Sequence, residues 1–279
     1  MKNILIISGI IILIVSINLL KSCTKREVPA LATSRVTNIT NSTATCGGTV
    51  TDEGSGGTVI TRGVCWSTEI NPSITENKTE DGTGSGTYVS KIFGLKEGTK
   101  YYVRAYATNN SGTGYGVTKS FYALEFGAKI NGGIVFYYND GTKQHGLVCA
   151  PTDQGTNVVW GCQGKEIAGS DGSGVGTGNQ NTVDIVNGCS TAEIAARICH
   201  DLELNGYNDW YLPSIGELYL MYKNLQMNGL GNFPYNSAYW SSSEDSNPDY
   251  AFGLVFHEPN QAWGYDKGSP LNVRAIRAF

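Results

Sequence analysis

Short alternating patterns of apolar and polar residues dominate the first half of the chain. Residues 43–50 alternate in this way, and so do residues 101–108. In the second stretch, Tyr101 and Val103 would share one face of a strand because side chains alternate across a β-strand. Turn-forming clusters of Gly, Ser and Asn separate such stretches about every 8–12 residues. The pattern predicts an all-β sandwich over residues 31–122.

A different pattern follows a predicted linker at residues 123–131. Residues 132–151 read as a hairpin with an Asn-Asp-Gly turn between two apolar strands. Capping boxes at residues 190–193 and 214–217 each precede apolar residues at helical spacing. The tail returns to short apolar stretches that are typical of strands. Residues 132–279 are therefore expected to form an α+β domain.

The N-terminus carries a continuous apolar run that Lys2 and Lys21 flank, and Cys23 follows it. This pattern predicts a signal peptide over residues 1–22. Leu20 lies three residues before Cys23, a placing that resembles the lipobox of bacterial lipoproteins, in which the cysteine is acylated. The alternative is an uncleaved anchor that spans the membrane once.

The lipobox resemblance implies where the protein is located. Lipidation at Cys23 would leave residues 23–30 as a tether and attach the protein to a membrane, since stable anchoring needs more than one acyl chain. We expect a lipid-anchored protein of the cell envelope, at the outer membrane or cell surface of a Gram-negative-type bacterium.

Composition narrows the possible partners. The chain has 279 residues, 16% of them charged, and a formal net charge of −4. A surface that binds nucleic acid needs clustered positive charge to neutralise phosphates, so we expect no nucleic-acid partner. The high content of Gly (36 residues) and Tyr (16 residues) is typical of turn-rich β-structure.

The first domain resembles a known family through the stretch from Leu95 to Asn109, which reads L-x-x-G-T-x-Y-x-V-R-A-Y-A-x-N. It is similar to the E–F corner and F strand of fibronectin type III domains. The resemblance implies a tyrosine corner, in which Leu95 packs and Tyr101 donates its phenol to the backbone. It also places Cys46 and Cys65 on neighbouring strands, which implies a disulfide between them. Such a domain would serve as a spacer.

The second domain resembles the Lcl C-terminal domain of collagen-like bacterial adhesins. The stretches that carry the resemblance are NGYNDWYLPSIGELY, YWSSSE and VRAIRAF. That family is distantly similar to C-type lectin-like folds, so the resemblance implies a C-type lectin-like α+β domain at residues 132–279. It further implies a surface protein with glycan ligands and brings no catalytic residues.

Six cysteines besides Cys23 suggest disulfides, because an even number is typical of exported proteins. Cys162 and Cys189 frame a long Gly-rich loop, and we expect them to pair. Cys149 and Cys199 would then pair by elimination or remain free, because four cysteines allow three pairings. Their spacing does not match a Cys-x-x-Cys zinc site, and we expect no metal centre of that kind.

A Glu-Pro-Asn tripeptide at residues 258–260 matches the one with which calcium-dependent lectins hold mannose-like sugars. In those lectins a second Asn-Asp pair completes the calcium shell of about 6–8 oxygens. Here Asn208 and Asp209 precede the tripeptide, which reverses the lectin order. The alternative is a β-turn, because Pro and Asn suit its central positions. Calcium, through Glu258 and Asn260, is thus the only cofactor that the sequence suggests.

Aromatic side chains offer another way to hold sugar, because a flat ring covers the apolar face of a pyranose. Trp263 follows the tripeptide and precedes Tyr265 and Asp266, so we expect it to form an exposed platform. Trp160, Trp210 and Trp240 lie among apolar residues and are expected in the core.

Catalytic patterns are missing from the sequence. The three histidines are scattered, and neither His-Glu-x-x-His nor Gly-x-Ser-x-Gly occurs. The sequence therefore predicts a non-catalytic surface binding or adhesion protein for a polysaccharide or surface glycan. The alternative is a structural or assembly partner of another envelope protein.

Overall fold

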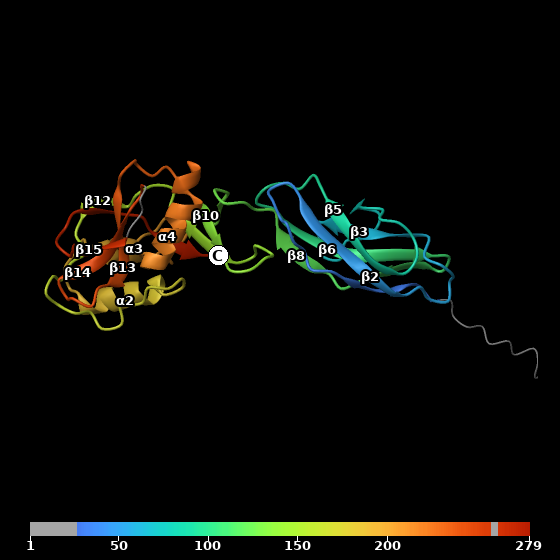
Figure 1. The fold of residues 1–279 in the computed structure, drawn as a ribbon, viewed down its shortest axis with the longest axis horizontal. Helices are drawn as coiled ribbons and strands as arrows, with labels where there is room; N and C mark the ends of the chain where they lie inside the picture. Colours follow the sequence, from blue (N-terminus) through green and yellow to red (C-terminus); the bar gives the residue numbers. More distant parts are fainter. Residues whose placement is uncertain (1–26, 258–261) are drawn as a thin grey trace, which may run out of the picture.

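The computed structural model describes residues 27–257 and 262–279. These residues form two β-rich bodies that lie end to end (Figure 1). Outside the described residues lie the predicted signal peptide at 1–22, the lipidation site Cys23, and the predicted ligands Glu258 and Asn260. Among the described residues, no helix has the length and hydrophobicity needed to cross a membrane.

The first body consists of two sheets. One has the order β1-β2-β5, with bounds Ala30–Thr33, Ala44–Asp52 and Gly86–Ile92. The other has the order β4-β3-β6-β7, with β8 also paired to β6; its bounds are Asn77–Lys78, Thr61–Ser67, Lys100–Asn109, Gly112–Tyr115 and Lys119–Tyr122. Every described pairing in this body is antiparallel.

The core of this sandwich comes from alternate residues of strands in both sheets, such as Cys46 of β2 and Val64 of β3. Val64 and Trp66 of β3 and Val103 of β6 are buried in one cluster with Leu95 and Tyr101. The predicted inward placement of Tyr101 and Val103 is therefore confirmed, although Tyr106, which the same alternation places on the opposite face, is buried as well. The Tyr101 hydroxyl oxygen accepts a hydrogen bond from the backbone N–H of Lys96 at 3.1 Å. The expected tyrosine corner is present, but its phenol accepts from the backbone where donation was expected.

The second body combines two sheets with three α-helices. The smaller sheet has the order β17-β11-β10-β9, with bounds Ile276–Ala278, Gly146–Cys149, Gly133–Tyr138 and Lys129–Ile130. The larger has the order β12-β16-β13-β14-β15, with bounds Gly155–Val158, Leu271–Val273, Ala238–Glu244, Tyr250–Val255 and Ala262–Asp266. The helices are α2 (Gly178–Gly188), α3 (Ala195–His200) and α4 (Ile215–Asn224), followed by the 3₁₀ turn η1 (Gln226–Asn228).

One of the two predicted capping boxes forms. Ser214 caps α4, where its side chain accepts from the N–H of Glu217 and the Glu217 carboxylate accepts from the N–H of Ser214. The predicted box at 190–193 is wrong, because Glu193 has a φ of +56° and α3 begins two residues later at Ala195. A positive φ at a non-glycine residue is incompatible with the helical turn that a capping box opens.

Two apolar clusters lie on opposite faces of the smaller sheet. Val135 and Val148 join one cluster, whereas their strand neighbours Ile134 and Leu147 join the other. Alternation along β10 and β11 sends neighbouring side chains to opposite faces. Trp160, Trp210 and Trp240 are all buried in the first cluster, which confirms their predicted place in the core.

The turn of the β10–β11 hairpin connects the two bodies. The Tyr122 N–H donates to the Thr142 carbonyl at 3.1 Å, and the Gln144 side chain makes two hydrogen bonds with Ser120 at 2.8 and 3.2 Å. Consecutive residues belong to different hydrophobic cores: Ala123 is buried in the core of the first body, and Leu124 is buried in the core of the second. The first two residues of the linker predicted at 123–131 are therefore buried in the two cores.

Candidate functional site

The predicted aromatic platform lies on β15, the edge strand of the larger sheet. Trp263 is 55% exposed and lies opposite Gly253 of β14. Alternation places Tyr265 on the same face, where its ring packs edge-on against buried Trp240 at 6.0 Å between centroids. A Cβ atom at position 253 would lie 2.9 Å from the Tyr265 ring, so glycine is needed beneath it. Tyr265 is therefore held against the core, and the exposed Trp263 lies two residues from it on the same face of β15.

Asp266 does not join this platform. Its carboxylate accepts from the Gln163 side chain at 2.7 Å and from the Gly268 N–H at 2.8 Å. Alternation along β15 also turns it to the opposite face from Trp263 and Tyr265. Of the five predicted binding residues, the structure therefore brings two together and separates Asp266, while Glu258 and Asn260 lie outside the described residues.

In the Asn208-Asp209 pair, the Asp209 carboxylate forms an ion pair with Arg277. Both Asp209 carboxylate oxygens accept from the Arg277 guanidinium, at 2.6 and 2.8 Å. The same guanidinium stacks 3.8 Å from the Tyr207 ring centroid. These hydrogen bonds from Arg277 hold the pKa of the Asp209 carboxyl below its usual range. Asp209 is therefore committed to an ion pair, and a role as a calcium ligand is not supported.

A cavity of about 560 Å³ opens beside the end of β13, and its lining includes Glu166, Asp171, Glu244 and Asp245. The Glu244 carboxylate turns inward from it and pairs with the buried ammonium of Lys267. It also accepts from the Ile167 N–H at 2.9 Å and from the Ser170 hydroxyl at 2.7 Å. Across the described ranges, no cluster of three or more His, Cys, Asp or Glu residues has a geometry that could hold a metal ion.

A comparison with known protein families finds a match for the larger part of the second body. The family model described as the Lcl C-terminal domain matches residues 150–277. The resemblance expected from the sequence is confirmed for this range, which we call the Lcl-matched region. It contains the Trp263 platform, the Glu244–Lys267 pair and all three helices.

Comparison with solved structures gives low similarity. The sensor domain of the anti-sigma factor RsgI4 in Pseudobacteroides cellulosolvens is 20% identical with a TM-score of 0.27, and the match covers 37% of this chain and 98% of that one. Chicken CNTN1 FN1–FN3 domains are 18% identical with a TM-score of 0.28, at 36% and 32% coverage. An FN3 domain of human collagen XX is 14% identical with a TM-score of 0.25, at 34% and 91% coverage. No curated protein matches the chain.

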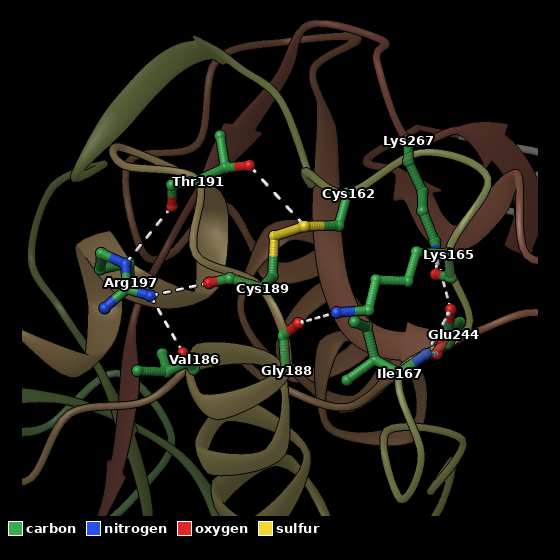
Figure 2. The surroundings of a disulfide bond; sticks show 10 residues. All are labelled: Cys162, Lys165, Ile167, Val186, Gly188, Cys189, Thr191, Arg197, Glu244 and Lys267. Atoms are coloured by element: carbon green, nitrogen blue, oxygen red, sulfur yellow. Dashed lines mark hydrogen bonds and ion pairs between the residues drawn. A yellow bond between two sulfur atoms is a disulfide. The ribbon is translucent and has the colours of Figure 1, made fainter.

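The Cys162–Cys189 disulfide in the Lcl-matched region is confirmed, with an Sγ–Sγ distance of 2.10 Å. Figure 2 shows that it meets the C-terminal end of α2, where backbone carbonyls accept from nearby cations. Arg197 donates to Cys189 at 2.8 Å and Lys165 donates to Gly188 at 2.6 Å. The disulfide and these cations therefore fix the end of a helix within the stretch that the sequence predicted to be a long Gly-rich loop.

The predicted Cys46–Cys65 disulfide is wrong, because both thiols are free and buried. Cys46 lies in the core between the sheets together with Val64 and Trp66. Cys65 lies between those two residues in β3, so alternation directs it to the outer face. There its sulfur donates to the Pro72 carbonyl at 3.3 Å.

The predicted Cys149–Cys199 disulfide is also wrong, and both residues are free thiols. Cys149 belongs to the cluster on one face of the smaller sheet and Cys199 of α3 to the cluster on the other. The sheet therefore separates the two sulfur atoms. The alternative in which they remain free is the one observed.

These four thiols are poor nucleophiles. Burial raises the pKa of Cys46 and of Cys65 to about 11 and that of Cys149 to about 12, and it raises the pKa of Cys199 further. Thiols with such pKa values remain protonated near pH 7, and the thiolate is the reactive form. The burial of these four thiols therefore gives no support to a site with a nucleophilic cysteine.

Sequence reasoning missed the buried charges of the Lcl-matched region. Besides Glu244 and Lys267, Arg274 is buried and donates to Asp153 at 2.6 Å. The available signal was the stretch VRAIRAF, where arginines interrupt an otherwise apolar terminal strand. Charged residues in such a position are rarely buried unless they are paired.

Proposed function

We propose that this protein is an exported lipoprotein that binds glycans at the cell envelope without transforming them. The leader and Cys23 support a lipid anchor at the outer membrane or cell surface of a Gram-negative-type bacterium. The first body would act as a spacer of the fibronectin type III kind. The second body would be a C-type lectin-like domain that carries the ligand site.

One observation carries this proposal: Trp263 is exposed on β15, a strand at the edge of the larger sheet. Trp263 is 55% exposed, whereas Tyr265 on the same face packs against the buried Trp240. A tryptophan side chain has only two rotatable torsions, so it loses little conformational entropy when a ligand covers it. A pyranose has the flat apolar face that such a ring can cover.

The direct test is a glycan array probed with the chain from Glu27 onward. We expect the wild-type protein to bind at least one polysaccharide or surface glycan, and Trp263→Ala to abolish that signal. Phe93→Ala is the matched control, because Phe93 is an exposed aromatic of the first body. A wild-type protein that binds no glycan, or a Trp263→Ala variant that binds as well as wild type, would contradict the proposal. Capture of an envelope protein without glycan would favour the structural role.

The anchor has a separate test in a lipoprotein-producing bacterium that is fed labelled palmitate. We expect wild-type protein to incorporate the label and Cys23→Ser to incorporate none, because the thiol is the acylated group. Cys46→Ser serves as the control, since Cys46 is buried within the first body. Equal labelling of Cys23→Ser and wild type would show that Cys23 is not the lipidation site.

A further inference from the structure

A second cavity lies at the junction of the two bodies, apart from the Trp263 platform. Its volume is about 540 Å³, within the usual range of 300–1,000 Å³ for ligand pockets. Residues of the connecting segment, of β10 and of the end of α4 line it. Figure 1 shows β15 on the side of the second body that faces away from this junction. A ligand here would therefore be independent of Trp263.

One wall of the cavity is aromatic. The rings of Phe126 and Tyr138 stack at 5.3 Å between centroids with an interplanar angle of 20°. Phe126 is 41% exposed, so part of this ring surface is open to a ligand. Leu230 also lines the cavity and lies close to Gly127, where an added Cβ would be 2.9 Å from its Cδ1. The apolar part of the lining thus consists of a stacked pair of rings and a leucine.

The polar part of the cavity consists mostly of hydrogen-bond acceptors. Asn224 uses its Nδ2 to donate to the Phe136 carbonyl at 2.9 Å, and Asn228 uses its Nδ2 to donate to the Lys223 carbonyl at 3.2 Å. Among the described hydrogen bonds, neither Oδ1 atom has a donor. The buried Tyr138 hydroxyl also has no partner in the described chain, and the Glu125 carboxylate is exposed beside it.

The one cation in the lining is already engaged. The Lys143 ammonium donates to the carbonyls of Ile39 at 2.8 Å and Leu124 at 2.5 Å, and lies 4.9 Å from the Tyr138 ring centroid. Together with Glu125, this arrangement disfavours an anionic ligand. A wholly apolar ligand is also disfavoured, because it would remove water from the acceptors without pairing them.

We propose that this junction cavity binds one neutral pyranose residue, with its apolar face on Phe126 and its hydroxyls on the Oδ1 atoms of Asn224 and Asn228. A neutral sugar combines a flat apolar face with several O–H donors, and both features match the lining. The site goes beyond the proposed platform, because it uses different residues from a different part of the fold.

The test is saturation-transfer NMR with the methyl pyranosides of glucose, galactose, mannose and N-acetylglucosamine. It uses the Trp263→Ala variant of the chain from Glu27 onward, so that the platform cannot contribute. We expect transfer to at least one glycoside. Phe126→Ala in the same background should weaken that binding on the order of tenfold, the loss expected for an aromatic contact.

A second variant tests the site without replacing an aromatic ring, because Phe126→Ala could weaken binding by destabilising the fold. Asn228→Ala removes an acceptor from an exposed position and should weaken binding several-fold, while the melting temperature falls only slightly because the lost hydrogen bond to Lys223 is exposed. Absence of transfer from all four glycosides would overturn the proposal, and so would full transfer in both Phe126→Ala and Asn228→Ala. Because every arm lacks Trp263, failure here leaves the array result for the platform unaffected.

Discussion

At the scale of single residues, the structure differs from the sequence-based expectation in two ways. It contains buried ion pairs that were not predicted, and four cysteines that were expected in disulfides are free thiols. Glu244 and Lys267 are both buried, and the Lys267 ammonium also lies 4.6 Å from the Trp160 ring centroid. Neither charge could be predicted as buried, because burial depends on a partner that is distant in sequence. The exposure of Trp263 could be predicted, because the residues around it in the sequence are mostly small or polar.

The buried ion pair gives the first stability prediction. Lys267→Met should lower the free energy of unfolding by about 3–5 kcal/mol, because it leaves the Glu244 carboxylate buried without its cation. Urea unfolding followed by tryptophan fluorescence measures the change. The double variant Glu244→Gln/Lys267→Met should be less destabilised, since it removes both charges. A loss below about 1 kcal/mol in the single variant would show that water or another cation replaces the pair.

At the scale of elements, strands were easier to predict than helices. Alternation identified the inward face of β6, and the capping box identified α4, because both signals are local. Helix α2 escaped prediction because three of its buried residues are Gly178, Asn181 and Thr182, so no apolar stripe marks it. The wrong pairing of Cys46 and Cys65 came from strand adjacency alone, whereas side-chain alternation in β3 sends Cys65 to the other face.

The confirmed disulfide carries an element-scale prediction. Replacing Cys162 and Cys189 together by serine should lower the free energy of unfolding by about 2–4 kcal/mol, because a loop with a sequence separation of 27 is released in the unfolded chain. Hydrogen exchange should show the largest loss of protection at the end of α2. Cys149→Ser/Cys199→Ser is unsuitable as a control, since both thiols are buried, so the exposed variant Phe93→Ala is used. Unchanged stability and unchanged protection of α2 would contradict the prediction.

At the scale of the whole molecule, the junction determines how the second body is oriented relative to the first. Four hydrogen bonds described above and the change of core between Ala123 and Leu124 tie the β10–β11 turn to the first body. This contact could not be predicted from the sequence, because polar turn residues usually face solvent. The hairpin itself could be predicted from the sequence, because Asn-Asp-Gly is typical of a hairpin turn.

Loss of the Lys143 ammonium should loosen the junction. Lys143→Ala removes the bonds to the Ile39 and Leu124 carbonyls, so the two bodies should adopt a wider range of relative orientations. Small-angle X-ray scattering of the chain from Glu27 onward should show a broader distance distribution than wild type. Lys91→Ala, at an exposed position of β5, should leave the distribution unchanged. Identical curves for all three proteins would mean that the core contacts alone hold the orientation.

The central claim, that an exposed tryptophan on β15 holds a glycan, is tested most directly by calorimetric titration. The wild-type chain and its Trp263→Ala variant would be titrated with the best glycan from the array. The account predicts saturable binding to the wild-type protein and no measurable heat of binding for Trp263→Ala. Equal dissociation constants for the two proteins would contradict it.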